Sequence, residues 1–187
     1  IYIGLMDGRL LKIDDTGSSG SIVWEVATGG GITASPIIDA FGNIYIGSLD
    51  GTFYNFSPDG ELIWSTELGS ELHSTAAIDG NGNLYVGSNS SESDIDGDMS
   101  VSANLYCLDS TGAIFSKFTS DGSIISPILL SGNKIFFGDT SGIVYKMILD
   151  TNYTSRDQYQ AMWGTFQGNN QRTGNQSDIN LHIVSDN

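Results

Sequence analysis

Short apolar runs separated by polar turns dominate the chain, and one run of four residues recurs almost unchanged. The phrase IYIG at Ile1–Gly4 returns as IYIG, LYVG and IFFG at 44–47, 84–87 and 135–138. These runs have the length of β-strands and are rich in β-branched and aromatic side chains. The apolar spacing of an amphipathic helix is absent from the sequence before the C-terminal tail. The pattern predicts an all-β protein.

Aligned on this phrase, the chain divides into units of about forty residues with four apolar runs each. The recurring phrase is the second run of a unit, here called run B. Run A lies at 32–39, 72–79 and 124–130. Run C lies at 9–14, 52–57, 104–109 and 143–148. Run D lies at 21–26, 61–66 and 113–118. Asp-Gly and Asn-Gly pairs between the runs favour tight hairpins.

Four-stranded meanders of this kind are typical of the blades of a β-propeller. The predicted units lie at about 1–31, 32–71, 72–123 and 124–150, followed by a tail over 151–187. The tryptophans Trp24 and Trp64 occupy the same place in run D of two successive units. They are expected to cover a blade and to pack against its neighbour. In the third unit this place falls on Ser116, so Phe115 or Phe118 is expected to substitute.

The third unit carries an insertion. Its run-B glycine lies 25 residues before the glycine that precedes run D, where the second unit has 13. The excess falls in SNSSESDIDGDMSVSA, residues 88–103, and is expected to form an acidic surface loop on one face. The run-B glycines themselves are expected to mark close backbone approach near the propeller axis.

Composition supports the β prediction and limits the kinds of partner that the protein is expected to bind. Glycine is abundant, with 24 residues, and proline is scarce, with 3, which suits many short strands joined by tight turns. The 22 acidic and 7 basic residues give a net charge of −15. A surface this negative repels phosphate backbones, so no nucleic-acid partner is expected. The charge favours solubility, with attraction of a cation or a basic partner as the functional alternative.

Two further classes of feature are excluded by the sequence. No apolar run reaches the length of a membrane span. The single cysteine, Cys107, cannot form an internal disulfide, and its apolar surroundings LYCLD favour a buried, unreactive thiol. His73 and His182 stand far apart without metal-ligand spacing, and no phosphate-binding loop or serine-hydrolase motif occurs.

The phrases SPIID, GNIYIGS, DGTFYNFSPDG and ELIWS, which lie within residues 35–65, resemble the PQQ-like, quinoprotein-type propeller repeat. The tail sequence WGTFQGNNQRTG, at 163–174, resembles a W-x-x-F-x-x-N-x-x-R-T-G motif that accompanies such repeats in many bacterial secreted and surface proteins. The resemblance covers roughly residues 1–175. It implies a propeller of about four PQQ-like blades of four antiparallel strands, as part of a larger ring.

The family includes PQQ dehydrogenases, outer-membrane assembly lipoproteins and non-catalytic surface modules, so the resemblance alone does not settle the function. We expect a non-catalytic module, secreted or in the cell envelope, that serves binding or surface assembly through protein or glycan contacts. The alternative is a fragment of a PQQ- and calcium-dependent quinoprotein dehydrogenase. The family's dehydrogenases carry a vicinal disulfide, which one cysteine excludes, and no unit has an obvious inward carboxylate with asparagine and arginine companions. No catalytic residue or cofactor is therefore expected.

The insertion supplies the one metal candidate. Glu92, Asp94, Asp96 and Asp98 stand at alternate positions, and carboxylates on a flexible loop can converge on Ca²⁺. The spacing does not follow the helix–loop–helix calcium pattern. A solvated acidic loop without calcium is the other interpretation.

The ends of the repeat array leave three arrangements open. The first unit lacks run A, and in the fourth unit Trp163 could supply the missing run D. Residues 179–185, INLHIVS, alternate like a strand and could pair with Ile1–Gly4 as the missing run A. This would close a four-bladed ring. The alternatives are an open segment of a larger ring and a homodimer that completes a ring of eight blades.

Overall fold

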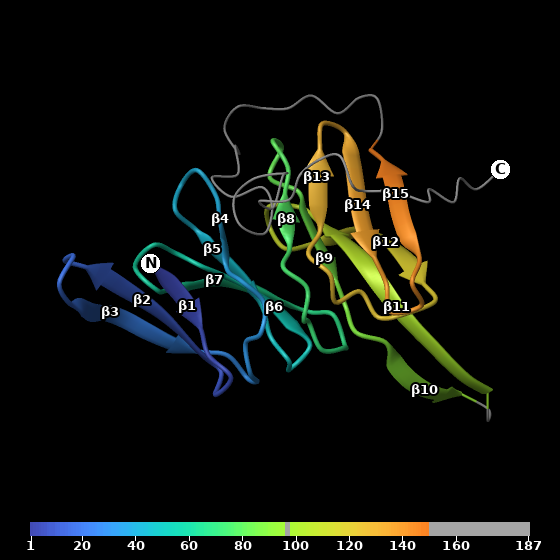
Figure 1. Ribbon diagram of the computed structural model, residues 1–187, viewed down its shortest axis with the longest axis horizontal. Helices are drawn as coiled ribbons and strands as arrows, with labels where there is room; N and C mark the ends of the chain where they lie inside the picture. The colour runs from blue at the N-terminus through green and yellow to red at the C-terminus, as the bar shows by residue number, and fades with distance from the viewer. Residues whose placement is uncertain (96–97, 150–187) are drawn as a thin grey trace.

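The computed structural model describes residues 1–95 and 98–149, and the side chains of these residues apart from 91–102. Four antiparallel sheets follow one another along the chain, from the blue N-terminal sheet to the orange last one in Figure 1. Each predicted unit contributes one sheet, and we number these sheets as blades 1 to 4. The described residues form strands and turns with no helix, so the all-β prediction is confirmed.

The strands run up and down within each blade. Blade 1 has the order β1 (Tyr2–Gly4), β2 (Arg9–Asp15), β3 (Gly20–Ala27). Blade 2 has the order β4 (Ile37–Ile38), β5 (Ile44–Gly47), β6 (Thr52–Phe56), β7 (Leu62–Glu67). Blade 3 contains β8 (Ala77–Ile78), β9 (Leu84–Gly87), β11 (Asp98–Leu108) and β12 (Ile114–Ser120), and β10 (Ser91–Ile95) pairs with the extended start of β11. Blade 4 has the order β13 (Leu129–Ser131), β14 (Lys134–Gly138), β15 (Val144–Ile148).

Runs B, C and D form strands close to their predicted bounds, whereas run A forms strands of only two or three residues. The first residue of each run A forms a hydrogen bond with the preceding blade and does not belong to the strand of its own blade. The amides of Ile32, Leu72 and Ile124 donate to carbonyls of the preceding blade at 2.9, 3.2 and 3.0 Å. Ser74 then replaces part of the ladder, because its Oγ donates to Gly87 O and accepts from Gly87 N. Half of run A therefore belongs to the junction between blades.

The run-B glycines allow this junction to close. A Cβ on Gly47 would lie 2.8 Å from Leu72 Cβ, and one on Gly87 would lie 2.6 Å from Ile124 Cβ. The predicted close approach is thus confirmed at Gly47 and Gly87, and its partner is the first apolar residue of the next blade. At Gly138 in blade 4 the nearest described atom would be 3.6 Å away.

The tryptophans join one blade to the next, as predicted. Trp24 Nε1 donates to Pro58 O at 3.0 Å, and its ring lies against Gly60 in the turn that begins run D of blade 2. Trp64 makes the same contacts with blade 3, through a 3.1 Å bond to Ser110 O and its ring against Gly112. Both glycines have positive φ angles and lack the side chain that would displace the indole.

In blade 3 the place of the tryptophan falls on Ser116, as counted from the sequence. Ser116 pairs with Cys107, just as Trp64 pairs with Asn55. Phe118, two residues further along β12, supplies the aromatic contact with blade 4 and packs edge-on against Tyr145 at 5.3 Å. Phe115 is exposed, so the substitute is Phe118.

The hydrophobic core consists of three clusters, one at each junction between successive blades. Leu10, Ile32 and Ile44 lie between blades 1 and 2, and Phe53 and Leu72 lie in the cluster between blades 2 and 3. The third cluster joins blades 3 and 4 and contains Leu105, Cys107, Ile124, Ile128, Ile135 and Phe137. Cys107 is buried as predicted, and burial raises the pKa of its thiol to about 11.

Several aspartates stabilise turns by accepting hydrogen bonds. Asp39 is fully buried, and its carboxylate accepts from the amides of Phe41 and Asn43, from Asn43 Nδ2 and from Tyr45 OH. Asp79 in blade 3 and Asp139 in blade 4 hold their turns and a tyrosine hydroxyl in the same way. A buried carboxylate is stable there because several donors satisfy its oxygens. Part of the acidic composition is therefore structural.

The insertion, expected as an acidic surface loop, is a β-ribbon of two paired strands. Strands β10 and β11 pair antiparallel from Ser91 with Ser102 to Ile95 with Asp98. In Figure 1 this ribbon extends away from the body of the four blades. The tail predictions for Trp163 and 179–185 fall outside the described residues. Within the described part of the chain, no helix has the length and apolar character to cross a membrane.

Candidate functional site

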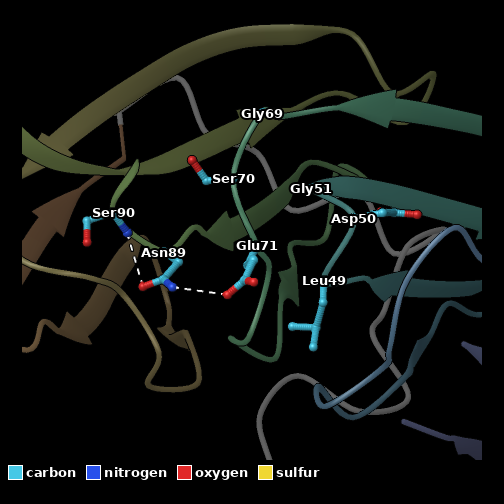
Figure 2. Close-up of a pocket in the computed structure, with 8 residues that line it drawn as sticks. All are labelled: Leu49, Asp50, Gly51, Gly69, Ser70, Glu71, Asn89 and Ser90. Atoms are coloured by element: carbon cyan, nitrogen blue, oxygen red, sulfur yellow. Dashed lines mark hydrogen bonds between the residues drawn. The ribbon is translucent and has the colours of Figure 1, made fainter. Parts of the chain in front are cut away.

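A hollow of about 460 Å³ lies between blades 2 and 3, at the base of the ribbon. It is formed by the turn between β5 and β6, the connection between β7 and β8, and the segment between β9 and β10. Figure 2 shows its lining residues, which are Leu49, Asp50, Gly51, Gly69, Ser70, Glu71, Asn89 and Ser90. The lining contains two carboxylates and no basic side chain.

The hollow exists because the insertion replaces a tight turn. In blade 2 the turn after β5 is short and places Asp50 against the backbone of Gly29 and Gly30 in the connection from blade 1. In blade 3 the two strands continue into the ribbon after Ser90. Gly69, which corresponds to Gly29, has no described atom within 4 Å of where its Cβ would be. The space that Asp50 fills at one junction is therefore open at the next.

Glu71 is held in place across the hollow. Its Oε2 accepts from Asn89 Nδ2 at 3.3 Å, as drawn in Figure 2, and lies 3.1 Å from His73 Nε2. The other ring nitrogen of His73 lies 3.2 Å from Thr33 Oγ1 in blade 2. The hydrogen bond with His73, followed by that from Asn89, lowers the pKa of Glu71 below its usual value. The carboxylate is therefore ionised at neutral pH, and about half of its side-chain surface is exposed, at 53%.

Asp50 is the second acidic residue of the lining, and its carboxylate points away from Glu71 (Figure 2), toward Tyr54 and Gly29 at the junction of blades 1 and 2. Burial opposes its ionised form, but hydrogen bonds from Tyr54 OH at 2.7 Å and from the amide of Thr52 outweigh burial and lower its pKa. Burial and the same bond to Asp50 raise the pKa of Tyr54. Both carboxylates are thus anionic at neutral pH, and the half-exposed Glu71 carboxylate makes the hollow suited to a cationic group.

Comparison with known protein families agrees with this architecture of successive antiparallel blades. The family model described as outer membrane protein assembly factor BamB, PQQ_2, matches residues 6–99, just over half of the chain. The chain belongs to this family. The resemblance to PQQ-like repeats is confirmed over the matched residues. A search of curated proteins returned no match for this BamB-type propeller.

Solved structures share the fold with this BamB-type propeller at low sequence identity. The computationally designed Ika4 protein has a TM-score of 0.62 at 16% identity, with 80% of this chain and 84% of that chain covered. The WD40 β-propeller domain of Doa1 has a TM-score of 0.59 at 13% identity, over 83% and 47% of the two chains. A protein of unknown function from Bacteroides caccae has a TM-score of 0.52 at 14% identity, over 80% and 57%. The predicted β-propeller fold is confirmed.

The calcium candidates of the BamB-type chain lie on the ribbon. Glu92 and Asp94 belong to β10, Asp98 begins β11 opposite Ile95, and Asp96 falls outside the described residues. Among the residues whose side chains the structure describes, no group of three or more histidines, cysteines and acidic residues could hold a metal ion. The calcium site on the ribbon stays a prediction.

Sequence reasoning missed the acidic residues of the hollow. Asp50 and Glu71 were not singled out, and His73 was set aside because no metal-ligand spacing surrounded it. One signal was present: the third unit lacks the Asp-Gly turn that follows run B in the first two units. A lost tight turn next to a connecting segment with Glu71 indicates an unfilled junction with a carboxylate on its wall.

Proposed function

We propose that this BamB-type propeller is a non-catalytic protein-binding module of the cell envelope, and that the hollow receives a cationic side chain of the partner. The observation that carries the proposal is the lining of the hollow, where the Glu71 carboxylate is half exposed and no lysine or arginine is among the lining residues. An arginine or lysine of a partner would supply the missing positive charge.

The hydrogen bonds around Glu71 support recognition of a cation. Asn89 and His73 fix the orientation of the carboxylate before a ligand arrives, so little side-chain entropy is lost on binding. The hydroxyls of Ser70 and Ser90 add polar acceptors along the wall.

The place of the hollow and the family support a role in assembly. Inserts on one face of a propeller often carry its binding function, and here the ribbon begins at the residue after Ser90. The matching family is named for an outer membrane protein assembly factor. By analogy, the partner of this chain is a protein that is assembled or held at the envelope.

The test uses a capped Gly-Arg-Gly peptide and its citrulline analogue, which has nearly the same shape without the charge. We expect the arginine peptide alone to shift the backbone amide resonances of Gly69–Glu71 and Ser90 in an NMR titration. Glu71→Gln should weaken this binding about twofold to fivefold, because one exposed ion pair is lost.

The matched control is Glu67→Gln, which removes the same charge from an exposed position on β7 outside the hollow. It should leave the affinity within about 1.5-fold of the unmodified protein. Equal shifts with the citrulline peptide, or equal weakening by both variants, would overturn the cation proposal.

A further inference from the structure

A row of exposed apolar residues follows the outermost strands of blades 1 to 3. Near the start of each of these strands lie two adjacent apolar side chains that are 45% to 56% exposed. The pairs are Ile22 and Val23 on β3, Leu62 and Ile63 on β7, and Ile114 and Phe115 on β12. We call these six residues the apolar rim.

The apolar rim coincides with a β-bulge that recurs in all three blades. In blade 1 the ladder passes from Lys12 with Trp24 to Ile13 with Ile22, so Val23 is the extra residue. Ile63 and Phe115 are the extra residues at the same place in blades 2 and 3. A bulge disrupts the edge ladder and prevents another strand from adding there. The backbone geometry does not demand apolar side chains, because a bulge residue exposed to water can be polar.

The tryptophans connect each pair to the turn before the next pair. The ring of Trp24 follows Ile22 and Val23 and lies on Gly60, two residues before Leu62. The ring of Trp64 follows Leu62 and Ile63 and lies on Gly112, two residues before Ile114. Each indole therefore links one apolar pair to the start of the next. Elsewhere on these strands the exposed positions include Glu25, Ser65 and Lys117, so the apolar character is concentrated at the bulges.

The charges beside the apolar rim identify the kind of partner. Exposed carboxylates flank the first two pairs: Asp14 pairs opposite Ser21, and Asp59 and Glu61 stand in the turn before Leu62. Along strands β3, β7 and β12 and the turns that lead into them, Lys117 is the one basic residue that the structure describes. A second copy of this chain would bring its own negative charge to the surface, which opposes self-association.

From this arrangement we infer that the apolar rim is a second docking surface, which binds an amphipathic, basic segment of a protein partner. Apolar side chains of the segment cover the bulge pairs, and its lysines or arginines face the flanking carboxylates. The bulges direct the partner to dock through side chains, because they interrupt the backbone hydrogen bonding of the edge. This surface is separate from the hollow and does not depend on the cation proposal.

The probe is an 18-residue amphipathic peptide of leucine and lysine, compared with one in which glutamate replaces each lysine. We expect the lysine peptide to bind the full chain, to shift amide resonances along β3, β7 and β12, and to dissociate as salt rises. The triple variant Val23→Ser, Ile63→Ser, Phe115→Ser should weaken binding at least tenfold. A second set, Val23→Thr, Ile63→Thr, Phe115→Tyr, keeps strand propensity should the serine set fail to fold.

Two controls separate the rim from other surfaces. Ile125→Ser with Ile148→Ser removes exposed apolar side chains away from the rim and should bind the lysine peptide as the unmodified protein does, and the exposed charge variant Glu67→Gln should also leave the contribution of the apolar pairs in place. Equal binding of the glutamate peptide, or unchanged binding by both rim sets, would overturn the inference. So would a concentration-dependent dimer, seen by sedimentation, that the rim variants abolish, because the occupant would then be a second copy.

Discussion

Strands β5 and β14 occupy the same place in blades 2 and 4, yet their burial differs. Every residue of β5 is buried, while β14 alternates between buried residues and residues that are exposed or partly exposed. Strand β9 in blade 3 is buried throughout, like β5. The difference shows that a blade covers one face of its neighbour and relies on the next blade for the other. Equivalent sequence positions therefore contribute differently to stability, according to whether a described neighbour follows.

The run-B glycines should show the largest contrast. Gly87→Ala would force its methyl group against Ile124 Cβ and backbone oxygen, atoms that move only with the chain. We expect a loss of about 2–3 kcal/mol in the free energy of unfolding. The same change at Gly138 meets no described atom closer than 3.6 Å and should cost less than about 0.5 kcal/mol. Urea unfolding measures both; equal losses would show that Gly138 is also covered.

The tyrosines that bind turn aspartates should show a smaller contrast. Tyr85→Phe leaves the buried Asp79 carboxylate without a hydrogen bond of 2.8 Å and should cost about 1–2 kcal/mol. Tyr145→Phe removes an equivalent 2.9 Å bond to Asp139 at a partly exposed site and should cost about half as much. Thermal unfolding of the two variants provides the comparison. A larger loss at Tyr145 would contradict the order of burial.

The hydrogen-bonded pair of Tyr145 and Asp139 predicts that the stability of blade 4 depends on pH. Burial, and then the hydrogen bond to Asp139, raise the pKa of Tyr145 from 10.0 to about 12. The unfolded chain then releases this proton at lower pH than the folded chain, so stability falls as pH rises from 10 to 12. Solvent screening keeps the loss below about 1 kcal/mol. Absorbance of phenolate during a pH titration should lose a step near pH 12 in Tyr145→Phe.

Removal of the ribbon should have the smallest effect on stability. Replacing residues 91–102 with an Asp-Gly turn leaves the bonds of Asn89 and Ser90 to neighbouring connections in place. We expect a change within about 0.5 kcal/mol and an unchanged β spectrum by circular dichroism, because the ribbon extends away from the blades. The arginine peptide should bind more weakly, since a tight turn would fill the hollow. A collapse of the fold would contradict this view of the ribbon.

The sequence predicted the features that repeat and missed those that depend on one side chain. Runs B, C and D carry their strand pattern in their own residues, so the phrase IYIG was sufficient to place β5. Run A appeared to be a strand of eight residues, but its first half forms the junction, and the hydroxyl of Ser74 stands in for backbone pairing. Apolar content alone does not distinguish a ladder residue from a junction residue.

The insertion shows a similar limit. Its alternating carboxylates suggested a metal-binding loop, although alternation is also the period of a strand, and Asp96-Gly97 stands between the paired residues Ile95 and Asp98. Prediction of the hollow requires a comparison of two junctions between blades, because Asp50 fills the first junction and no aspartate stands at the same place in the second. Such an absence becomes visible only when equivalent turns lie side by side in space.

The aspartates in the turns set a limit on how the protein can be re-engineered. A protein designer who wished to bring the isoelectric point from about 4.1 toward neutrality would naturally begin with the excess of acidic residues. Asp39 and Asp79 are unsuitable targets, because each joins an otherwise irregular turn to a tyrosine in the next strand. Exposed glutamates such as Glu61 and Glu67 can be exchanged instead. Charge reversal would therefore follow the outer strands and leave the acidic turns as a fixed part of the propeller.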